Sequence, residues 1–206
     1  MELDDIKNTW ASYDEKLNKS LKLNEELLRK LNLDKSKREM KGPFYYETTS
    51  LIMTGLLIIV ISGYTYRYGS EIVYLVSGLL SILFCLTEFV FSFQKLKILT
   101  RIDYYNMSVI DLQKNVLTFK NKYLQFKKIE LTYTPLFVVS LIPILGKGLR
   151  GFDFFSYYTL YIFITIIVLI IAYPILIWIY KNLYDKKLKN TMQFLKELEV
   201  FEKNES

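Results

Sequence analysis

The chain alternates long apolar stretches with stretches dense in charge, so its polar and apolar residues are arranged in blocks. Residues 48–68 contain no charged residue before Arg67, residues 72–93 contain only Glu88, and residues 156–180 contain none. An α-helix rises about 1.5 Å per residue, so each stretch is long enough to cross a hydrocarbon core about 30 Å thick. The pattern therefore predicts membrane-spanning helices at these three places.

A fourth apolar window, residues 131–149, is weaker because it contains Pro135, Pro143 and Lys147. A proline removes one backbone hydrogen bond from a helix, and lipid offers no replacement. A re-entrant segment is therefore an alternative to a fourth span.

Basic residues gather in three segments, and only three of the 27 lysines and arginines lie elsewhere. Residues 1–47 contain ten, residues 94–130 contain eight and residues 181–206 contain six. Cytoplasmic segments collect basic residues, and these segments share one side only if an even number of spans separates them. We therefore expect four spans in the inner (cytoplasmic) membrane, paired in residues 48–93 and 131–180, with both termini and the central loop in the cytoplasm.

The two later charged segments carry apolar stripes with helical spacing. In the central segment, nine apolar residues recur at alternating steps of four and three: Ile98, Ile102, Tyr105, Val109, Leu112, Val116, Phe119, Tyr123 and Phe126. This heptad rhythm predicts a helix that packs on other helices as in a coiled coil, with a kink or restart at IDYYNMS, residues 102–108. A shorter amphipathic helix is predicted near the C-terminus from Leu188, Met192, Leu195, Leu198 and Phe201.

The first segment has a similar stripe. Ile6, Trp10, Tyr13 and Leu17 recur at steps of four, three and four, which places them on one face of a helix. Gly42-Pro43 is expected to interrupt the helix before the first span. The pattern as a whole predicts an all-α fold: a four-span transmembrane helix bundle with three cytoplasmic amphipathic helices, in residues 1–47, 94–130 and 181–206.

None of these three helices can bury its stripe alone. The spans hold the central and C-terminal helices close together, so we expect them to pack on each other or on their copies in a homo-oligomer. For the N-terminal helix, three arrangements are possible. It can lie in a groove of a partner protein, pack on its own bundle, or lie on the membrane. Its acidic residues (Asp4, Asp5, Asp14 and Glu15) argue against the last, because anionic lipid repels them.

We therefore take Ile6, Trp10, Tyr13 and Leu17 as candidate partner-binding residues. If this hypothesis holds, residues 1–40 are expected to be dispensable for the bundle.

The composition of the chain excludes several kinds of catalytic and metal-binding site. The chain has no histidine, and Cys85, its single cysteine, lies in an apolar run, which excludes a Cys/His zinc site. Phosphate-binding glycine loops and nucleophile elbows are also absent. We expect no catalysis, cofactor or metal site. The central segment has a net charge of +5, which favours contact with membrane lipid, and we expect no nucleic-acid binding because its aromatic and basic residues lie on opposite faces.

Glu88 is the only carboxylate inside the predicted spans, and an intramembrane acid is a candidate functional residue. The small residues Ser77, Ser81, Cys85 and Ser92 share its helix face, and a row of small residues lets helices approach closely. A buried hydrogen bond, a side chain reaching the interface, and an ion or proton role are the three alternatives for Glu88.

Residues 3–40, LDDIKNTWASYDEKLNKSLKLNEELLRKLNLDKSKREM, resemble the opening of a family of small bacterial multi-span membrane proteins encoded beside ECF-type sigma factors. Those proteins are similar to membrane-bound anti-sigma factors. The resemblance implies that the N-terminal helix holds a sigma factor at the membrane, although the chain departs from the familiar single-span layout. We therefore expect a non-enzymatic regulator that tethers a cytoplasmic partner. The alternative is a channel or transporter-like bundle whose cytoplasmic helices mediate oligomerisation.

Overall fold

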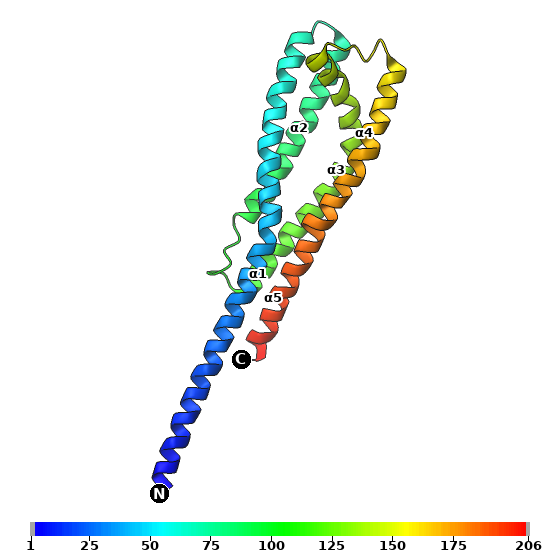
Figure 1. Cartoon of the computed structure of the whole chain (residues 1–206). Coiled ribbons are helices and arrows are strands. Elements are labelled where there is room, and N and C mark those ends of the chain that lie inside the picture. Colours follow the sequence, from blue (N-terminus) through cyan, green and yellow to red (C-terminus); the bar gives the residue numbers. More distant parts are fainter. Residues whose placement is uncertain (1–2, 205–206) are drawn as a thin grey trace.

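The computed structural model describes residues 3–204, with the side chains of Trp10 and of residues 13–200. Every regular element in that range is helical: α1 (Leu3–Tyr68), α2 (Ile72–Leu99), α3 (Val109–Arg150), α4 (Tyr158–Ile179), the π-helical turn η1 (Tyr180–Asp185) and α5 (Lys186–Asn204). Because α4, η1 and α5 follow one another without a break, they form one rod, and the chain is a bundle of four long rods (Figure 1). The expected all-α fold class is confirmed.

Each rod is long and apolar enough to cross a membrane, within Tyr13–Tyr68, Ile72–Leu99, Val109–Arg150 and Tyr158–Val200. We call residues 48–93 and 131–180 the apolar half of the bundle, and the remaining described residues the polar half. Many large side chains of the apolar half are exposed, among them Ile59, Phe163 and Ile170. Lipid can cover such a surface, whereas water cannot do so favourably, so the four rods indicate a membrane protein.

The prolines do not interrupt α3, which is one helix through both Pro135 and Pro143. Each proline frees the carbonyl group four residues before it, and α4 supplies a tyrosine hydroxyl to each of these carbonyl oxygens. Tyr173 donates to Leu131 O at 2.9 Å, and Tyr161 donates to Val139 O at 2.6 Å. The fourth apolar window is therefore part of a continuous helix that is long and apolar enough to cross a membrane, which favours a fourth span over a re-entrant segment.

Helix α1 also continues through Gly42-Pro43, where the sequence pattern predicts a break; that expectation is wrong. Pro43 is buried, and its neighbour Met40 lies in the hydrophobic core with only 4% of its surface exposed. Packing against the other rods therefore outweighs the local preference of this dipeptide for a turn. As a result, α1 is a single rod on the order of 100 Å long at about 1.5 Å per residue.

The central heptad pattern stops and restarts near residues 102–108, which is one of the two predicted outcomes. Helix α2 ends at Leu99, and α3 begins at Val109 after a loop. The Asp103 carboxylate accepts hydrogen bonds from the backbone N–H groups of Tyr105 and Asn106. Ser108 then caps α3, because its hydroxyl oxygen accepts a hydrogen bond from Asp111 N at 3.1 Å. Side-chain hydrogen bonds of Asp103 and Ser108 therefore replace several helical ones in the loop and at the start of α3.

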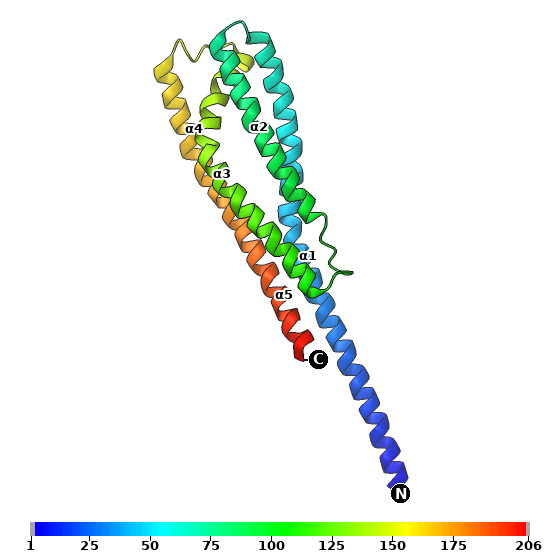
Figure 2. The same ribbon diagram turned by 180° about the vertical axis from the view of Figure 1, so that it is seen from behind.

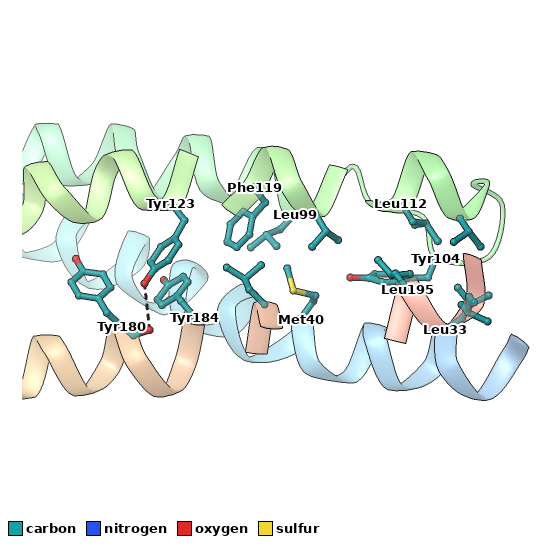
Figure 3. Packing of buried hydrophobic residues seen from close by; sticks show 14 residues of the cluster. Leu33, Met40, Leu99, Tyr104, Leu112, Phe119, Tyr123, Tyr180, Tyr184 and Leu195 are labelled. Carbon is teal, nitrogen blue, oxygen red and sulfur yellow. Dashed lines mark hydrogen bonds between the residues drawn. The ribbon is translucent and has the colours of Figure 1, made fainter. Parts of the chain in front are cut away.

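From Val109 onward, the heptad stripe is buried as predicted. Val109, Leu112, Val116, Phe119 and Tyr123 pack with α5 and α1 in one hydrophobic core (Figure 3). The predicted C-terminal stripe joins this core through Leu188, Leu195 and Leu198.

Residues 1–40 are not dispensable as a block, because α1 contributes Leu33 and Met40 to this core. The polar stretches are continuations of the long rods, and they pack on one another within a single chain.

Candidate functional site

The N-terminal part of α1 extends well beyond the rest of the bundle (Figure 1). We call residues 3–31 the arm. The opposite view shows the same arrangement: the N-terminal part of the arm is clear of the other helices, and the last turns of the arm pass beside the end of α5 (Figure 2). Its described side chains are exposed up to Leu31, and the first buried residue is Asn32.

Three of the four candidate partner-binding residues have described side chains, and all three are exposed on the arm. The exposed fractions are 70% for Trp10, 68% for Tyr13 and 59% for Leu17. The side chain of Ile6 lies outside the described part of the chain. Further along the arm, Leu27 and Leu31 are also exposed. The bundle therefore does not bury this stripe, in contrast to the stripes of α3 and α5.

The direction of the arm follows from the continuity of α1. No loop separates the arm from the first apolar rod, so the arm continues along the direction of that rod (Figures 1 and 2). At about 1.5 Å per residue, the arm is about 40 Å long, and its N-terminal part projects away from the bundle. This geometry does not favour an arm lying flat on a membrane that the same rod crosses.

A second site lies inside the bundle, where the polar and apolar halves meet. Lys95 Nζ lies 2.9 Å from Glu47 Oε1 and 3.2 Å from Glu130 Oε1. All three residues are buried, with 6% or less of each exposed. Tyr184 donates a hydrogen bond to Glu47, and Tyr180 donates one to Glu130. Helices α1, α2 and α3 and the η1 turn thus converge on one network of charged hydrogen bonds.

Glu88 belongs to the same region and lies two turns before Lys95 in α2. Its Oε2 atom accepts a hydrogen bond of 2.7 Å from Tyr133 of α3, and its Oε1 atom a long one of 3.4 Å from Ser92. A hydrogen bond between helices therefore exists, in agreement with one of the three alternatives for this residue. Among the described residues, the ion pairs of Lys95 go to Glu47 and Glu130 and none reaches Glu88. We call Glu47, Glu88, Lys95 and Glu130 the charge cluster.

A cavity of about 440 Å³ opens beside the charge cluster. At its polar end lie Glu88, Lys95, Glu130, Tyr133 and Tyr180. Its other walls are mainly apolar and come from all four rods; they include Leu57, Phe84, Phe137, Val138, Ala172, Ile175 and Leu176. This volume falls within the range of about 300–1,000 Å³ that is typical of small-molecule sites.

Sequence reasoning missed three members of the charge cluster, because Glu47, Lys95 and Glu130 lie just outside the predicted spans. A signal was nevertheless present in the heptad rhythm. Continued one step beyond Phe126 it reaches Glu130, and one step before Ile98 it reaches Lys95. A stripe that stays in register should keep the same face buried even where its residues become charged.

The fold and its sites define an all-helical bundle of four apolar rods, with an exposed arm at one end and a charge cluster inside. Comparisons with known protein families, with curated proteins and with solved structures find no match for this chain.

Proposed function

We propose that the protein is a non-enzymatic regulator in the inner membrane that tethers a cytoplasmic protein through its arm. The observation that carries this proposal is the exposed stripe of Trp10, Tyr13 and Leu17 on a helix that leaves the bundle. Large aromatic side chains are typical anchors at protein interfaces, because a rigid ring buries much area with little loss of entropy. An amphipathic helix of this kind can lie in a hydrophobic groove of a partner.

The proposed orientation places the arm in the cytoplasm. Lysine and arginine concentrate in residues 1–47, 94–130 and 181–206, and such segments face the cytoplasm in most membrane proteins. The arm, the loop between α2 and α3, and the end of α5 also lie toward the same end of the bundle (Figure 1). This common direction supports an arrangement in which all three share one side.

An ECF-type sigma factor is the partner that we propose, on the strength of the resemblance of residues 3–40. The test is capture of sigma factors from cytoplasmic extract of the source cell by the detergent-solubilised protein, with the bound proteins identified by mass spectrometry. The deletion should remove residues 1–30 and leave Leu33 and Met40 in the core. We expect an ECF-type sigma factor to bind the intact chain and to be lost with the deletion.

Point variants sharpen this test. Trp10→Ala should weaken capture by about 2–4 kcal/mol, the range of an interface hot spot, and Leu17→Ala should weaken it less. Glu15→Ala is the matched control, because Glu15 lies on the opposite face of the arm, and it should leave binding unchanged. The proposal fails if no sigma factor is captured, or if the shortened chain captures it as well as the intact chain does.

The alternative function, a channel or transporter-like bundle, is favoured by one observation, the cavity with Glu88 at its polar end. On this hypothesis the arms of several copies pack together and mediate oligomerisation. Removal of residues 1–30 would then reduce the molecular mass of the protein–detergent particle, measured by light scattering, and no sigma factor would be captured.

A further inference from the structure

We propose that the cavity beside the charge cluster binds an organic cation with an apolar body, such as a lipophilic ammonium or phosphonium ion. This inference does not depend on the proposed function, because the arm contributes no residue to the cavity. It rests on three features of the bundle: the imbalance of charge, the position of Glu88, and the division of the cavity into a polar end and apolar walls.

The imbalance of charge favours a cation. The cluster brings three carboxyl groups together with one ammonium group, and Lys95 is already paired with Glu47 and Glu130. Glu47 Oε2 is buried and accepts no hydrogen bond within the described part of the chain. A buried carboxylate is stabilised by nearby positive charge, and in this cluster one ammonium group serves three carboxyl groups. An added cation would reduce the deficit.

Glu88 is the member of the cluster that can receive this cation. It lines the cavity, it is only partly buried, and its carboxylate is held in place by the Tyr133 hydroxyl at 2.7 Å. No ion pair of the described residues uses it, so a ligand does not have to displace a lysine. Tyr133 also stacks on Phe84, with ring centroids 5.5 Å apart, and aromatic faces beside a carboxylate add cation–π attraction for an organic cation.

The walls select the class of cation. A metal ion is bound by several converging ligands, and in the described residues no group of three such side chains is placed to hold one. A proton alone would need no space. In contrast, this cavity has about 440 Å³ of volume and walls that include Phe137, Ile175 and Leu176, which suit an apolar body. The cationic group of such a ligand would pair with Glu88, and its apolar body would pack against these walls.

The experiment is equilibrium dialysis of the full chain in detergent micelles against tetraphenylphosphonium. Tetraphenylborate, which has the same shape and the opposite charge, is the matched control probe. We expect saturable binding of the phosphonium ion at one site per chain, and only non-saturable partition of the borate. Equal uptake of both probes, or no saturable uptake of the phosphonium ion, would overturn the proposal.

Two variants locate the site. Glu88→Gln removes the charge but keeps an oxygen that accepts the Tyr133 hydrogen bond, and it should weaken binding about tenfold or more, as loss of a charged partner does. Ala172→Leu places extra bulk in the cavity wall without changing any charge, and it should also weaken binding. Glu71→Gln is the control, because Glu71 lies outside the cavity, in an ion pair with Lys147.

Thermal unfolding of each variant verifies that it is folded. If Glu88→Gln is folded and binds the phosphonium ion as tightly as the original chain, the inference is wrong. Capture of a sigma factor is measured separately with Trp10→Ala, so failure of either proposal leaves the other open to its own test.

Discussion

The hydrogen bond from Tyr161 to Val139 O gives a sharp test of how α3 tolerates its prolines. Tyr161→Phe removes only the hydroxyl group that donates to this carbonyl oxygen at 2.6 Å. Val139 has no helical donor, because the residue four positions later is Pro143. Hydrogen bonds between helices in membranes average about 0.6 kcal/mol, with values up to about 1.7. We expect a loss of about 1 kcal/mol in the free energy of unfolding, because the carbonyl group is left without any donor.

The second perturbation is Pro143→Ala, which returns an N–H group to the position four residues after Val139. The Val139 carbonyl oxygen then has a donor within α3, so the Tyr161 hydroxyl becomes less important. Tyr161→Phe should therefore destabilise the chain less in the Pro143→Ala background than in the original chain. In a double-mutant cycle, we expect an interaction energy of about 0.5 kcal/mol or more. Pro143→Ala also removes the packing of the proline ring. This loss is the same with and without Tyr161→Phe, so it cancels in the cycle.

The assay is equilibrium unfolding in detergent micelles with increasing sodium dodecyl sulfate, followed by helical circular dichroism. Tyr158→Phe is the matched control: it lies in the same helix, 70% of its surface is exposed, and no hydrogen bond of its hydroxyl exists in the described structure. It should leave stability unchanged. If Tyr161→Phe destabilises both backgrounds equally, the hydroxyl does not compensate for Pro143, and our account of α3 is refuted.

Three further predictions concern packing, pH and topology. Gly148→Leu should lower stability by about 1–3 kcal/mol, because a Cβ atom there would lie 2.3 Å from the Tyr64 ring, whereas Gly63→Leu, in open space, should not. The hydrogen bond from Tyr74 holds the pKa of Asp153 below its usual 3.8, so this carboxylate stabilises the fold above that value. Its contribution disappears as the pH falls through the lower folded pKa, and Asp153→Asn should remove this part of the acid dependence in thermal unfolding. Reporter fusions at the C-terminus and in the loop between α2 and α3 should both read cytoplasmic; a periplasmic signal from the loop would contradict four spans.

The positions of three apolar stretches could be predicted from the sequence alone, and the distribution of basic residues favoured a fourth. Lipid offers no hydrogen bonds to the backbone, so a chain that crosses it must be apolar over a whole helix, and this requirement is visible in any window of about 20 residues. The buried stripe from Val109 to Tyr123 was also predictable, because helix periodicity is a local property. Helix periodicity also predicted that Trp10, Tyr13 and Leu17 form a stripe on one helix face. It did not show whether the bundle covers this stripe.

Only the tertiary structure determined whether the helices continue through their prolines and which distant residues come into contact. The dipeptide Gly42-Pro43 predicts an interruption of the helix. Helix α1 nevertheless continues through it, because the neighbouring rods bury Pro43 and Met40. Glu47, Lys95 and Glu130 are far apart in the chain, and only the alignment of three rods makes them one network. The two prolines of α3 likewise free carbonyl oxygens whose donors come from another helix. For Pro143 that donor is a tyrosine 18 residues later, on a different helix, and the local sequence around a proline contains no information about it.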